Sequence, residues 1–490
     1  MRKYRVLDLF AGGGGFSTGF LDASYSGYQF DIVKAIDIDE DACATLSRHL
    51  GPEKVIHGDI TDKKVKEQLI RECQGVDVII GGPPCQTFSL AGPARSGSQE
   101  MREALKNDPR NVLYKHFLEI VNALRPRFVV FENVLGIVSK SVDAPNDESI
   151  SSKDKLVIEA ICDELHLMGY NAHIEGSITD RYQILNAADY GVPQQRKRVI
   201  IIANRCNVSN PVPEKTHGVG LKPYRTLKDA IEDLPVVLPE INLSRFDTLK
   251  NLSVIEQNLG KSMDIFVEGI KSLTKIYNDR QEVQGQEFTE LLNYINGECK
   301  RIKNKKTWKM KELKSFIQGY NQRLGKLNRS DNIASATTLH VSRQHNFRDI
   351  IIFMHMKAGS NSARFMNKQS DDYDPFLDQL YPYARNKHKD TYVKHAWDKP
   401  SNTILAHMEK DGLKFIHPVQ PRSFTPYEAA LLQSFPEDYE FCGNANAQYR
   451  QIGNAVPPKL AKSIGDALLK ILVQCEQNRQ VNGKLKSFSA

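Results

Sequence analysis

The sequence predicts an α/β protein whose core is a doubly wound, mostly parallel sheet. Over the first 205 residues, short apolar runs typical of buried strands alternate with amphipathic segments typical of helices. A glycine-rich turn, residues 11–16, separates the first strand from the first helix, and an acid ends the second strand. This is a general arrangement for nucleotide-type ligands. The chain has 490 residues, and because single cores stop growing near roughly 250–300 residues, we expect two domains.

Each expected element follows from a run of residues with one periodicity. The apolar runs predict strands at residues 6–10, 30–37, 54–60, 76–82, 128–134 and 198–203. The amphipathic segments predict helices that begin near residue 17 and that span residues 39–50, 62–71, 111–124 and 151–168. Residues 90–108 lack periodicity, so we expect a mobile loop there. Right-handed crossovers between parallel strands connect these elements most simply.

The composition is that of a globular protein, with 40% hydrophobic and 26% charged residues. No apolar run is long enough to span a bilayer and no signal-peptide pattern is present, so we expect a cytoplasmic protein without a membrane contact. The eight cysteines are scattered without a CxxC pair, and the histidines do not cluster. This argues against a zinc site or a disulfide framework and for a reducing compartment. A net charge of +7 is a mild indication of a polyanionic partner.

One cysteine stands where a nucleophile would be placed. Pro83 and Pro84 end the apolar run 76–82, because neither can donate a backbone N–H to a sheet. Cys85 therefore follows on a stiff turn at the carboxyl end of a central strand, where open α/β sheets bind ligands. The alternative is that Cys85 is a small buried hydrophobic residue, as most free cysteines are.

The glycine turn and the acids behind it predict a nucleoside-type cofactor. Asp37 would accept hydrogen bonds from ribose hydroxyls, with Ile38 as an apolar surface for adenine and Asp59 as an acceptor for its amino group. The run 12–15 is not GxGxxG, and no P-loop lysine follows. A nucleoside without phosphates, such as S-adenosylmethionine, therefore fits better than a pyrophosphate. A purely structural tight turn is the alternative.

Glu132, Arg196 and Arg198 complete the candidate site. Glu132 lies at the end of the buried strand 128–134, where an unpaired carboxylate is costly and a functional one is expected. Arg196 and Arg198 stand on alternate residues, and so on one side of the strand that follows. The alternatives are a hydrogen-bonded structural carboxylate and a solvated strand entry.

Six segments of this chain, in order, resemble the motifs of the 5-methylcytosine DNA methyltransferases. They are residues 8–16 (DLFAGGGGF), 82–89 (GPPCQTFS), 132–134 (ENV), 194–198 (QQRKR), 422–436 (RSFTPYEAALLQSFP) and 450–458 (RQIGNAVPP). The resemblance implies a Rossmann-like, S-adenosylmethionine-dependent methyltransferase fold with a smaller, inserted target-recognition domain. The cofactor would be held by Phe10, Ala11, Gly12, Gly14, Gly15, Asp37, Ile38, Asp59, Ile60, Gly82, Pro83 and Asn454.

The same resemblance implies a discontinuous catalytic domain, residues 1–205 and 397–476, with the recognition region at 206–396. Gly453 and Asn454 would lie in a loop before a C-terminal helix, residues 458–473, that packs beside the first strands. A polar, frayed tail, residues 477–490, would follow.

The implied reaction is methyl transfer to C5 of a cytosine flipped out of duplex DNA. The Cys85 thiolate would add to C6, and Glu132 would hydrogen-bond or protonate N3. Arg198 would donate to O2, and Arg196 would hold that side of the pocket or a nearby phosphate. The loop 90–108 would close over the flipped base. The chemistry needs no metal ion, and we expect none.

The interval between the two blocks is rich in lysine and has helix-like apolar spacing over residues 249–327. Residues 299–330 hold eleven Lys or Arg and one acid, Glu312. A solvated helical face is one interpretation, and contact with DNA phosphates is the other. Residues 339–346 and 381–399 are better candidates for base contacts. We expect His340, His345, His407 and His417 to be structural or to contact DNA rather than to bind a metal.

These features predict the modification enzyme of a prokaryotic restriction–modification system. It would act as a monomer on double-stranded DNA, associated with the nucleoid, and share its target sequence with a restriction endonuclease without a stable complex. An RNA cytosine-5 methyltransferase of the same fold is the first alternative. A catalytically silent DNA-binding module is the second, although such a module has no reason to retain Cys85, Glu132, Arg196 and Arg198 together.

Overall fold

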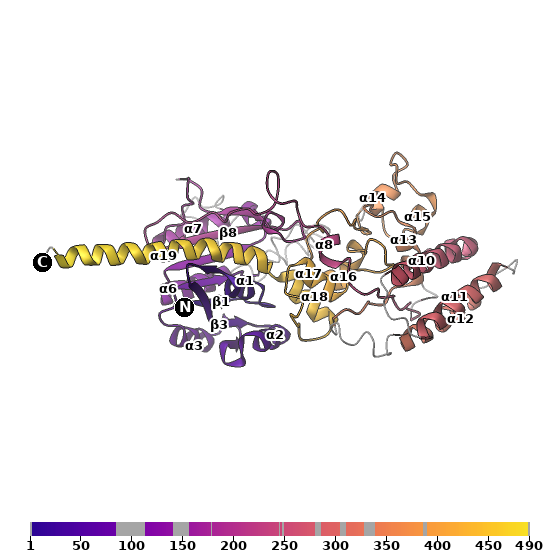
Figure 1. Cartoon of the computed structure of the whole chain (residues 1–490), viewed down its shortest axis with the longest axis horizontal. Coiled ribbons are helices and arrows are strands. Elements are labelled where there is room, and N and C mark those ends of the chain that lie inside the picture. The colour runs from indigo at the N-terminus through magenta and orange to yellow at the C-terminus, as the bar shows by residue number, and fades with distance from the viewer. Residues whose placement is uncertain are drawn as a thin grey trace, which may run out of the picture. The chain divides into compact units, whose positions relative to one another are not determined.

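The structure is a computed structural model that describes residues 2–84, 113–140, 156–177, 179–244, 246, 249–279, 286–303, 310–327, 339–385 and 390–488. It divides into two compact units (Figure 1). Unit 1 contains Met1–Arg225, Asn402–Ile404 and Gln433–Ala490. Unit 2 contains Thr226–Ser401 and Leu405–Leu432.

These unit boundaries differ from the domain boundaries expected from the sequence, 206 and 397. Residues 206–225 belong to unit 1, partly because the Asn210 side-chain amide donates to the carbonyls of Asn171 and His173 at 2.9 and 3.0 Å. Residues 405–432 belong to unit 2, where Arg422 Nε donates to Val237 O at 2.9 Å. Long-range hydrogen bonds, rather than the order of the motifs, decide which unit these segments join.

Unit 1 is built on one eight-stranded sheet with the order β2-β3-β1-β5-β6-β8-β7, and β4 also pairs with β3. The strands are β1 (Arg2–Leu9), β2 (Ser24–Tyr25), β3 (Tyr28–Asp37), β4 (Val55–His57), β5 (Val78–Gly81), β6 (Phe128–Asn133), β7 (Gln183–Asn186) and β8 (Lys197–Asn204). The pairs β1–β3, β1–β5, β3–β4 and β5–β6 are parallel. The mostly parallel α/β sheet predicted from the sequence is therefore confirmed.

The late strand predicted at 198–203 exists as β8, but its expected parallel direction is wrong. It pairs antiparallel with both β6 and β7. Strand β7 was not expected at all, because only two of its four residues, Ile184 and Leu185, are apolar. A short connection that contains the helical turn Ala187–Tyr190 joins β7 to β8, and a connection of this length permits only an antiparallel pair.

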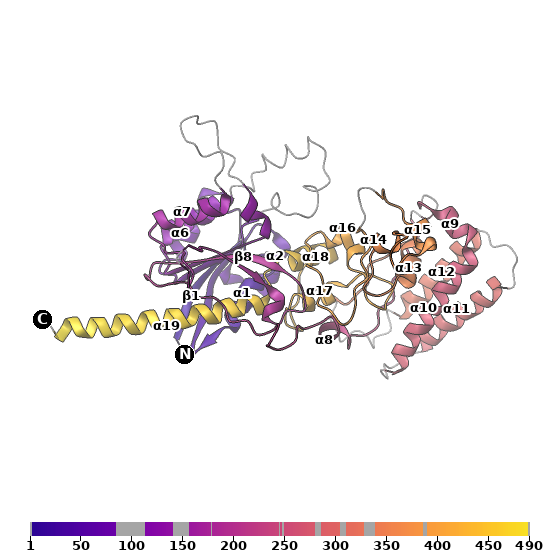
Figure 2. The same cartoon turned by 90° about the horizontal axis from the view of Figure 1, so that it is seen from above.

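Helices cover both faces of the sheet, as the doubly wound prediction requires. One face packs against α3 (Lys63–Glu72), α6 (Leu113–Leu124) and α7 (Val157–Leu167). The other packs against α1 (Gly15–Asp22), α2 (Glu40–Leu50) and α19 (Pro458–Phe488). Figure 2 shows α6 and α7 on one side of the sheet and α19 on the other. Alternate residues of β1, β5 and β6 enter the two cores, because successive side chains of a strand point to opposite faces.

Several predicted helix ends are confirmed, and two predictions near the C-terminus are wrong. Asp39 caps α2 by accepting from Ala42 N at 3.1 Å. Asn454 does not lie in a loop but ends α18 (Ala445–Asn454), which Asn444 caps. Helix α19 does not stop at residue 473; it continues through most of the expected frayed tail, residues 477–490. No proline interrupts residues 474–488, and Gln, Lys and Leu there favour helix.

Unit 2 is mainly helical, and most of its helices pack around one hydrophobic core. Its helices are α8 (Lys228–Ile231), α9 (Leu252–Gln257), α10 (Leu259–Asp279), α11 (Gln286–Lys303), α12 (Met310–Leu327), α13 (Phe347–His355), α14 (Ser362–Phe365), α15 (Pro375–Leu380), α16 (Met408–Asp411) and α17 (Pro426–Leu432). Phe266 of α10 meets Phe316 and Tyr320 of α12 edge to face, each at 5.6 Å between ring centroids. The Tyr320 hydroxyl donates to Pro239 O at 3.1 Å, which joins these helices to the start of the unit.

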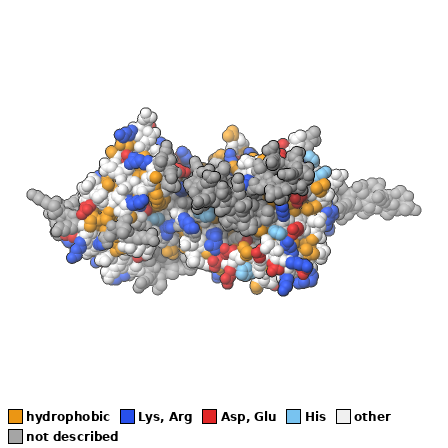
Figure 3. Space-filling model, turned by 180° about the vertical axis from the view of Figure 1, so that it is seen from behind, with side chains coloured by type: hydrophobic (Ala, Val, Ile, Leu, Met, Phe, Trp, Pro, Cys, Tyr) orange, Lys and Arg blue, Asp and Glu red, His pale blue; other side chains and the backbone are white. Residues whose placement is uncertain are grey.

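Among the described residues visible in Figure 3, basic side chains are scattered between hydrophobic and acidic ones. Among the helices of the described residues, none is long and apolar enough to cross a membrane.

Candidate active site

The carboxyl ends of β5 and β6 lie together and bring Pro83 to Glu132. The Asn133 side-chain amide donates to Pro83 O at 3.2 Å, which ties the proline turn to the end of β6. A Cβ added at Gly82 would lie 2.6 Å from Glu132 Oε2, so only glycine lets the carboxylate lie against this turn. Cys85 follows Pro84 directly in the chain but lies outside the described residues, as does the loop 90–108.

Glu132 forms an ion pair with Arg198 at the edge of this turn. The distance between Glu132 Oε1 and Arg198 Nε is 2.7 Å, and both side chains are only 10% exposed. Burial raises the pKa of Glu132, although the positive charges of Arg198 and Arg196 oppose the rise. Burial likewise lowers the pKa of Arg198, against the stabilising charge of Glu132. A carboxyl with a raised pKa holds a proton nearer neutral pH than an ordinary glutamate does.

Arg196 and Arg198 are both buried, as expected for residues that alternate along one strand. The Arg196 guanidinium, however, donates its hydrogen bonds to backbone carbonyls inside the protein. The side chain is fully buried. It donates to Ile404 O at 2.8 Å, Gly453 O at 2.8 Å and Ala455 O at 2.9 Å. The expected phosphate contact is therefore wrong for this conformation, because burial keeps the guanidinium from a phosphate. The other expectation, that Arg196 holds one side of the pocket, agrees with these bonds.

Gln194, just before β8, also bonds to residues in the C-terminal part of the chain. Its side chain donates to Gln433 Oε1 at 3.0 Å and accepts from Ile404 N at 2.9 Å. These polar groups join residues that are more than 200 positions apart in sequence. Sequence spacing alone could not reveal that they meet.

The glycine turn after β1 is held by Asp37, the acid at the end of β3. Asp37 accepts from Gly12 N at 2.8 Å and from Asp39 N at 2.9 Å, one bond on each carboxylate oxygen. Phe10 and Gly12 both have positive φ, 59° and 54°. Beside this turn Ile38 is 65% exposed and Asp59 is exposed. Asp37 therefore bonds directly to the turn, and Gly58, the neighbour of Asp59, donates its N–H to Asp37 O at 3.0 Å. Of the other residues expected to contact the cofactor, Ala11, Ile60 and Pro83 are buried and Asn454 is exposed.

Packing explains three of the four glycines in the turn. A Cβ at Gly15 would lie 2.2 Å from Val456 O, and one at Gly14 would lie 2.5 Å from the Tyr439 hydroxyl. A Cβ at Gly13 would also be tight, at 3.0 Å from the Phe441 ring. Only at Gly12 would a Cβ meet no atom within 4 Å. The turn is thus partly the structural turn weighed as an alternative, with open space left at Gly12.

Asp8 is a buried acid beside this turn that sequence reasoning did not select. Its Oδ2 accepts from Ser17 Oγ at 2.6 Å, while its buried Oδ1 has no hydrogen-bond partner among the described residues. Burial raises the pKa of Asp8 to about 7. The available signal was a single acid inside the apolar run 6–10.

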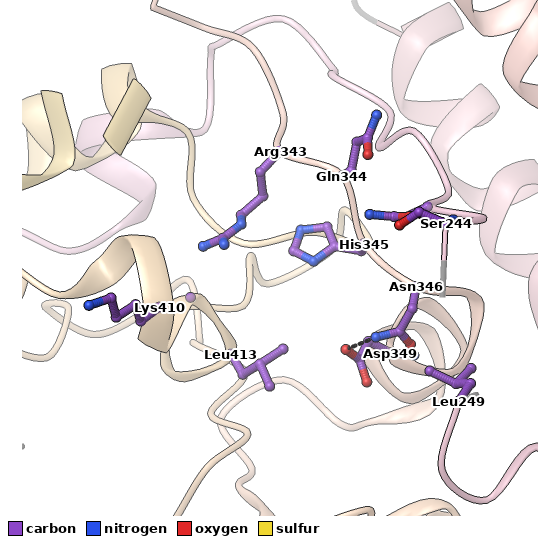
Figure 4. A pocket seen from close by; sticks show the side chains of 11 residues that line it. Ser244, Leu249, Arg343, Gln344, His345, Asn346, Asp349, Lys410 and Leu413 are labelled. Carbon is purple, nitrogen blue, oxygen red and sulfur yellow. Dashed lines mark hydrogen bonds between the residues drawn. The ribbon is translucent and has the colours of Figure 1, made fainter. Parts of the chain in front are cut away.

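Unit 2 contains a polar pocket of about 490 Å³, lined in part by Arg343, Gln344, His345 and Asn346 from the segment proposed for base contacts. Figure 4 shows Arg343 and Lys410 on one side of it and the hydrogen-bonded Asn346 and Asp349 on the other. Arg343 Nη1 donates to Met408 O at 3.0 Å, and the Gln344 amide donates to Glu240 Oε2 at 2.9 Å.

The histidines around this segment have structural partners. His345 Nε2 accepts from Ser423 N at 3.2 Å, and burial lowers the pKa of His345 to about 3. His340 bonds to Thr425 Oγ1 at 3.0 Å and to Pro235 O at 2.9 Å. His417 Nδ1 accepts from Val419 N and Gln420 N. These bonds fit the structural interpretation of the three residues.

The sheet, the proline turn and the buried acid together define a methyltransferase of the Rossmann-like class. The family model described as C-5 cytosine-specific DNA methylase matches residues 4–470, and the chain belongs to this family. It is a DNA cytosine-5 methyltransferase, and the resemblance seen in the sequence is confirmed. The RNA methyltransferase and the silent binding module are therefore set aside.

Relatives match over nearly the whole chain. M.OihORF3336P of Oceanobacillus iheyensis, provisionally named a type II methyltransferase, is 30% identical over 493 residues, 95% of each chain. The type II methyltransferase M.DdeI of Desulfomicrobium norvegicum is 30% identical, over 94% of this chain and 88% of its own. A solved structure described provisionally as a prophage-encoded DNA modification methyltransferase of E. coli is 20% identical and aligns over 96% of this chain and 99% of its own. Its TM-score is 0.54, which supports the fold alone.

Proposed function

We propose that this enzyme transfers the methyl group of S-adenosylmethionine to C5 of a cytosine flipped out of a specific duplex DNA sequence. A covalent bond between Cys85 Sγ and C6 of the ring would activate C5. The observation that carries the proposal is the Glu132–Arg198 ion pair, which lies against Gly82, three residues before Cys85. The neighbouring Asn133 bonds to Pro83 O. A buried acid packed against the turn that leads into Cys85 suits chemistry on a ring that must be both attacked and protonated.

The glycine turn fits the proposed cofactor. Open space at Gly12, the exposed Ile38 side chain and the acids Asp37 and Asp59 would hold a nucleoside, together with the other residues expected to contact it. When bound there, S-adenosylmethionine supplies an electrophilic methyl group. Both carboxylate oxygens of Asp37 already accept one backbone N–H, and each retains a lone pair for a ribose hydroxyl.

Cys85 and Glu132 have complementary roles: Cys85 is the nucleophile at C6, and Glu132 is the acid at N3. The Cys85 thiolate forms the bond to C6, and the ring electrons move toward N3 and C5. Glu132 donates a proton or hydrogen bond at N3, which offsets the charge that accumulates there. C5 then accepts the methyl group, and S-adenosylhomocysteine is the leaving group. A water molecule or a side chain takes the proton from C5, and the electrons of that C–H bond re-form the C5–C6 double bond. The Cys85 thiolate then leaves C6, and N3 returns its proton to Glu132.

Arg198 positions Glu132 and contacts the ring. Among the described residues its guanidinium bonds only to Glu132 and to Lys197 O, which leaves Nη2 available for the ring O2. Arg196 is a positioning residue that holds β8 against residues 404, 453 and 455.

Unit 2 would read the target sequence through the segment 339–346. Arg343 and Gln344 are residue types that recognise guanine and adenine edges in the major groove, and both line its polar pocket. We further propose that the enzyme is a monomeric cytoplasmic protein of the nucleoid. It would protect its target sequence from a restriction endonuclease with which it forms no stable complex.

Fluorinated DNA tests the covalent step. Fluorine at C5 cannot leave as a proton does, so target duplex containing 5-fluorocytosine should trap the Cys85 adduct after methyl transfer. Incubated with S-adenosylmethionine, the wild-type protein should give a shifted band on a denaturing gel, and Cys85→Ser should give none while still binding DNA. Absence of the band with wild-type protein, on DNA that is methylated when unfluorinated, would contradict the mechanism.

A further inference from the structure

A hairpin of unit 1, residues 214–225, presents an apolar tip to solvent. A turn closes at Gly218–Leu221, where Leu221 N donates to Gly218 O at 3.1 Å and Gly220 has φ 75°. The Val219 side chain at the corner of this turn is fully exposed, and that of Leu221 is 51% exposed. Two large aliphatic side chains of one turn are thus exposed, and contiguous apolar surface of this kind can mark a binding site.

The base of this 214–225 hairpin is fixed to Asp189. Backbone N–H groups of Thr216 and His217 donate to Asp189 O at 2.9 and 3.0 Å. The Tyr224 hydroxyl donates to one carboxylate oxygen at 3.0 Å, and Lys215 Nζ lies 2.8 Å from the other. The His217 ring rests on Gly191, where an added Cβ would lie 2.7 Å from the ring. These contacts fix the base of the hairpin to the segment 189–191.

Cations lie on the 214–225 hairpin and near its His217. Lys215 and Lys222 are exposed on the hairpin, and Arg225 and Lys459 lie close enough to act on His217. Burial lowers the pKa of His217, and the charges of Lys222, Lys459 and Arg225 lower it further. Glu214 is the one acid of the hairpin, and it pairs with Lys470 at 3.1 Å. Lys215 is paired with Asp189, whereas Lys222, Arg225 and Lys459 add positive charge near His217.

We propose that the 214–225 hairpin is a second DNA-contacting element, in which Val219 and Leu221 press on the sugars and base edges of the duplex while Lys222 contacts a phosphate. This rests on the proposed function, because duplex DNA is the polyanion that this enzyme must hold. Rigid aliphatic wedges flanked by cations are a recurring way for proteins to grip the minor groove. The anchor points, Asp189 and Gly191, come just before the strand that carries Arg198, so the hairpin can couple DNA contact to the site.

Two variants separate the contribution of the apolar tip to DNA affinity from that of Lys222. Val219→Ser with Leu221→Ser should weaken the affinity for both target and non-target duplex about tenfold and leave the salt slope unchanged, because no phosphate contact is lost. Lys222→Gln should reduce the slope of log K against log salt by about one. Leu167→Ser, on another exposed aliphatic residue, is the matched control and should bind like the wild type. Fluorescence anisotropy at four salt concentrations gives both quantities, and thermal melting checks that each variant is folded.

Wild-type affinity in the folded tip variant would overturn the proposal. So would an unchanged DNA affinity accompanied by lost binding to vesicles of anionic phospholipid, since the tip would then serve a membrane. Failure of the proposed function is distinguishable, because in that case the wild-type protein would neither methylate nor trap fluorinated duplex.

Discussion

At residue 132 the protein buries a carboxylate and gives it one charged partner. The Arg198 guanidinium at 2.7 Å keeps Glu132 in place, while burial keeps its pKa raised. An isolated buried charge would be far more costly than this pair. The arrangement holds the carboxyl group that we propose as the proton donor at a fixed position beside the proline turn.

Glu132→Gln tests that role. The amide has the same shape and can still bond to Arg198 through its oxygen, but it cannot transfer a proton to N3. We expect the single-turnover methylation rate to fall by about 10²–10⁴, with DNA affinity changed little. Rapid-quench assays with labelled cofactor measure the rate. A variant as fast as the wild type would show that Glu132 only fills space.

Asp8 should make stability depend on pH. Its pKa is about 7 in the folded protein against an ordinary value of 3.8, so the folded state binds the proton more tightly than the unfolded state. Stability should therefore fall as pH rises from about 4 to 7, by about 1.4 kcal/mol for each unit of the pKa difference. Asp8→Asn should remove this fall.

Urea denaturation of wild type and Asp8→Asn at pH 5 and pH 8 measures the difference. The exposed surface acid Asp233 supplies the control, as Asp233→Asn. Parallel pH profiles for wild type and Asp8→Asn would contradict the prediction.

At the scale of elements, helix α1 lies so close to α19 that a glycine is required between them. A Cβ at Gly19 would lie 2.3 Å from Pro458 O and 2.5 Å from Ala461 Cβ. The backbone of α19 cannot move aside easily, because its next turns fill the sheet core through Ile464 and Leu468.

Gly19→Ala should therefore destabilise unit 1 by about 1–3 kcal/mol through overpacking, which exceeds the gain of about 1 kcal/mol from helix propensity. Gly297→Ala in α11 is the matched control, because a Cβ there meets no atom within 4 Å. That substitution should stabilise the protein by up to about 1 kcal/mol. Chemical denaturation measures the change in the free energy of unfolding for each variant. Equal changes in the two variants would contradict the packing argument.

The lysine-rich helices show why a charge run is ambiguous. Arg323 of α12 lies 3.9 Å from the Tyr294 ring centroid, and Lys314 lies 5.6 Å from that of Phe246. Two cations of the run thus stabilise contacts within unit 2. Lys311 and Lys326 are exposed on the same helix, so phosphate contact remains a proposal for those positions.

At the scale of the whole molecule, unit 1 is assembled from distant parts of the chain. Residues 460–473 of α19 supply a share of its core, and Arg196 binds the carbonyls of Gly453 and Ala455. Without the C-terminal block, α1 and α2 would remain on this face of the sheet, but the part that α19 covers would be exposed.

A fragment of residues 1–225 should therefore not fold cooperatively alone, and co-expression with residues 402–490 should restore a folded, cofactor-binding unit. Near-ultraviolet circular dichroism and binding of labelled S-adenosylmethionine measure the two properties. A fragment 1–225 that unfolds cooperatively by itself would contradict this dependence on the C-terminal block.

The sequence by itself determined the sheet class, most parallel strands and the placement of Glu132, Asp37 and the proline turn at strand ends. These follow from local periodicity and from proline and glycine chemistry, which need only neighbouring residues. Tertiary structure alone decided the antiparallel β8, the burial of Arg196 and the packing of Gly14 and Gly15. Each of these depends on which distant segments meet. Strand β7 pairs with β8, residues 404, 453 and 455 bind Arg196, and Val456 packs against the glycine turn. Long-range contacts of this kind leave no periodic signal in the chain, because any of several buried segments could supply the same apolar or carbonyl partner.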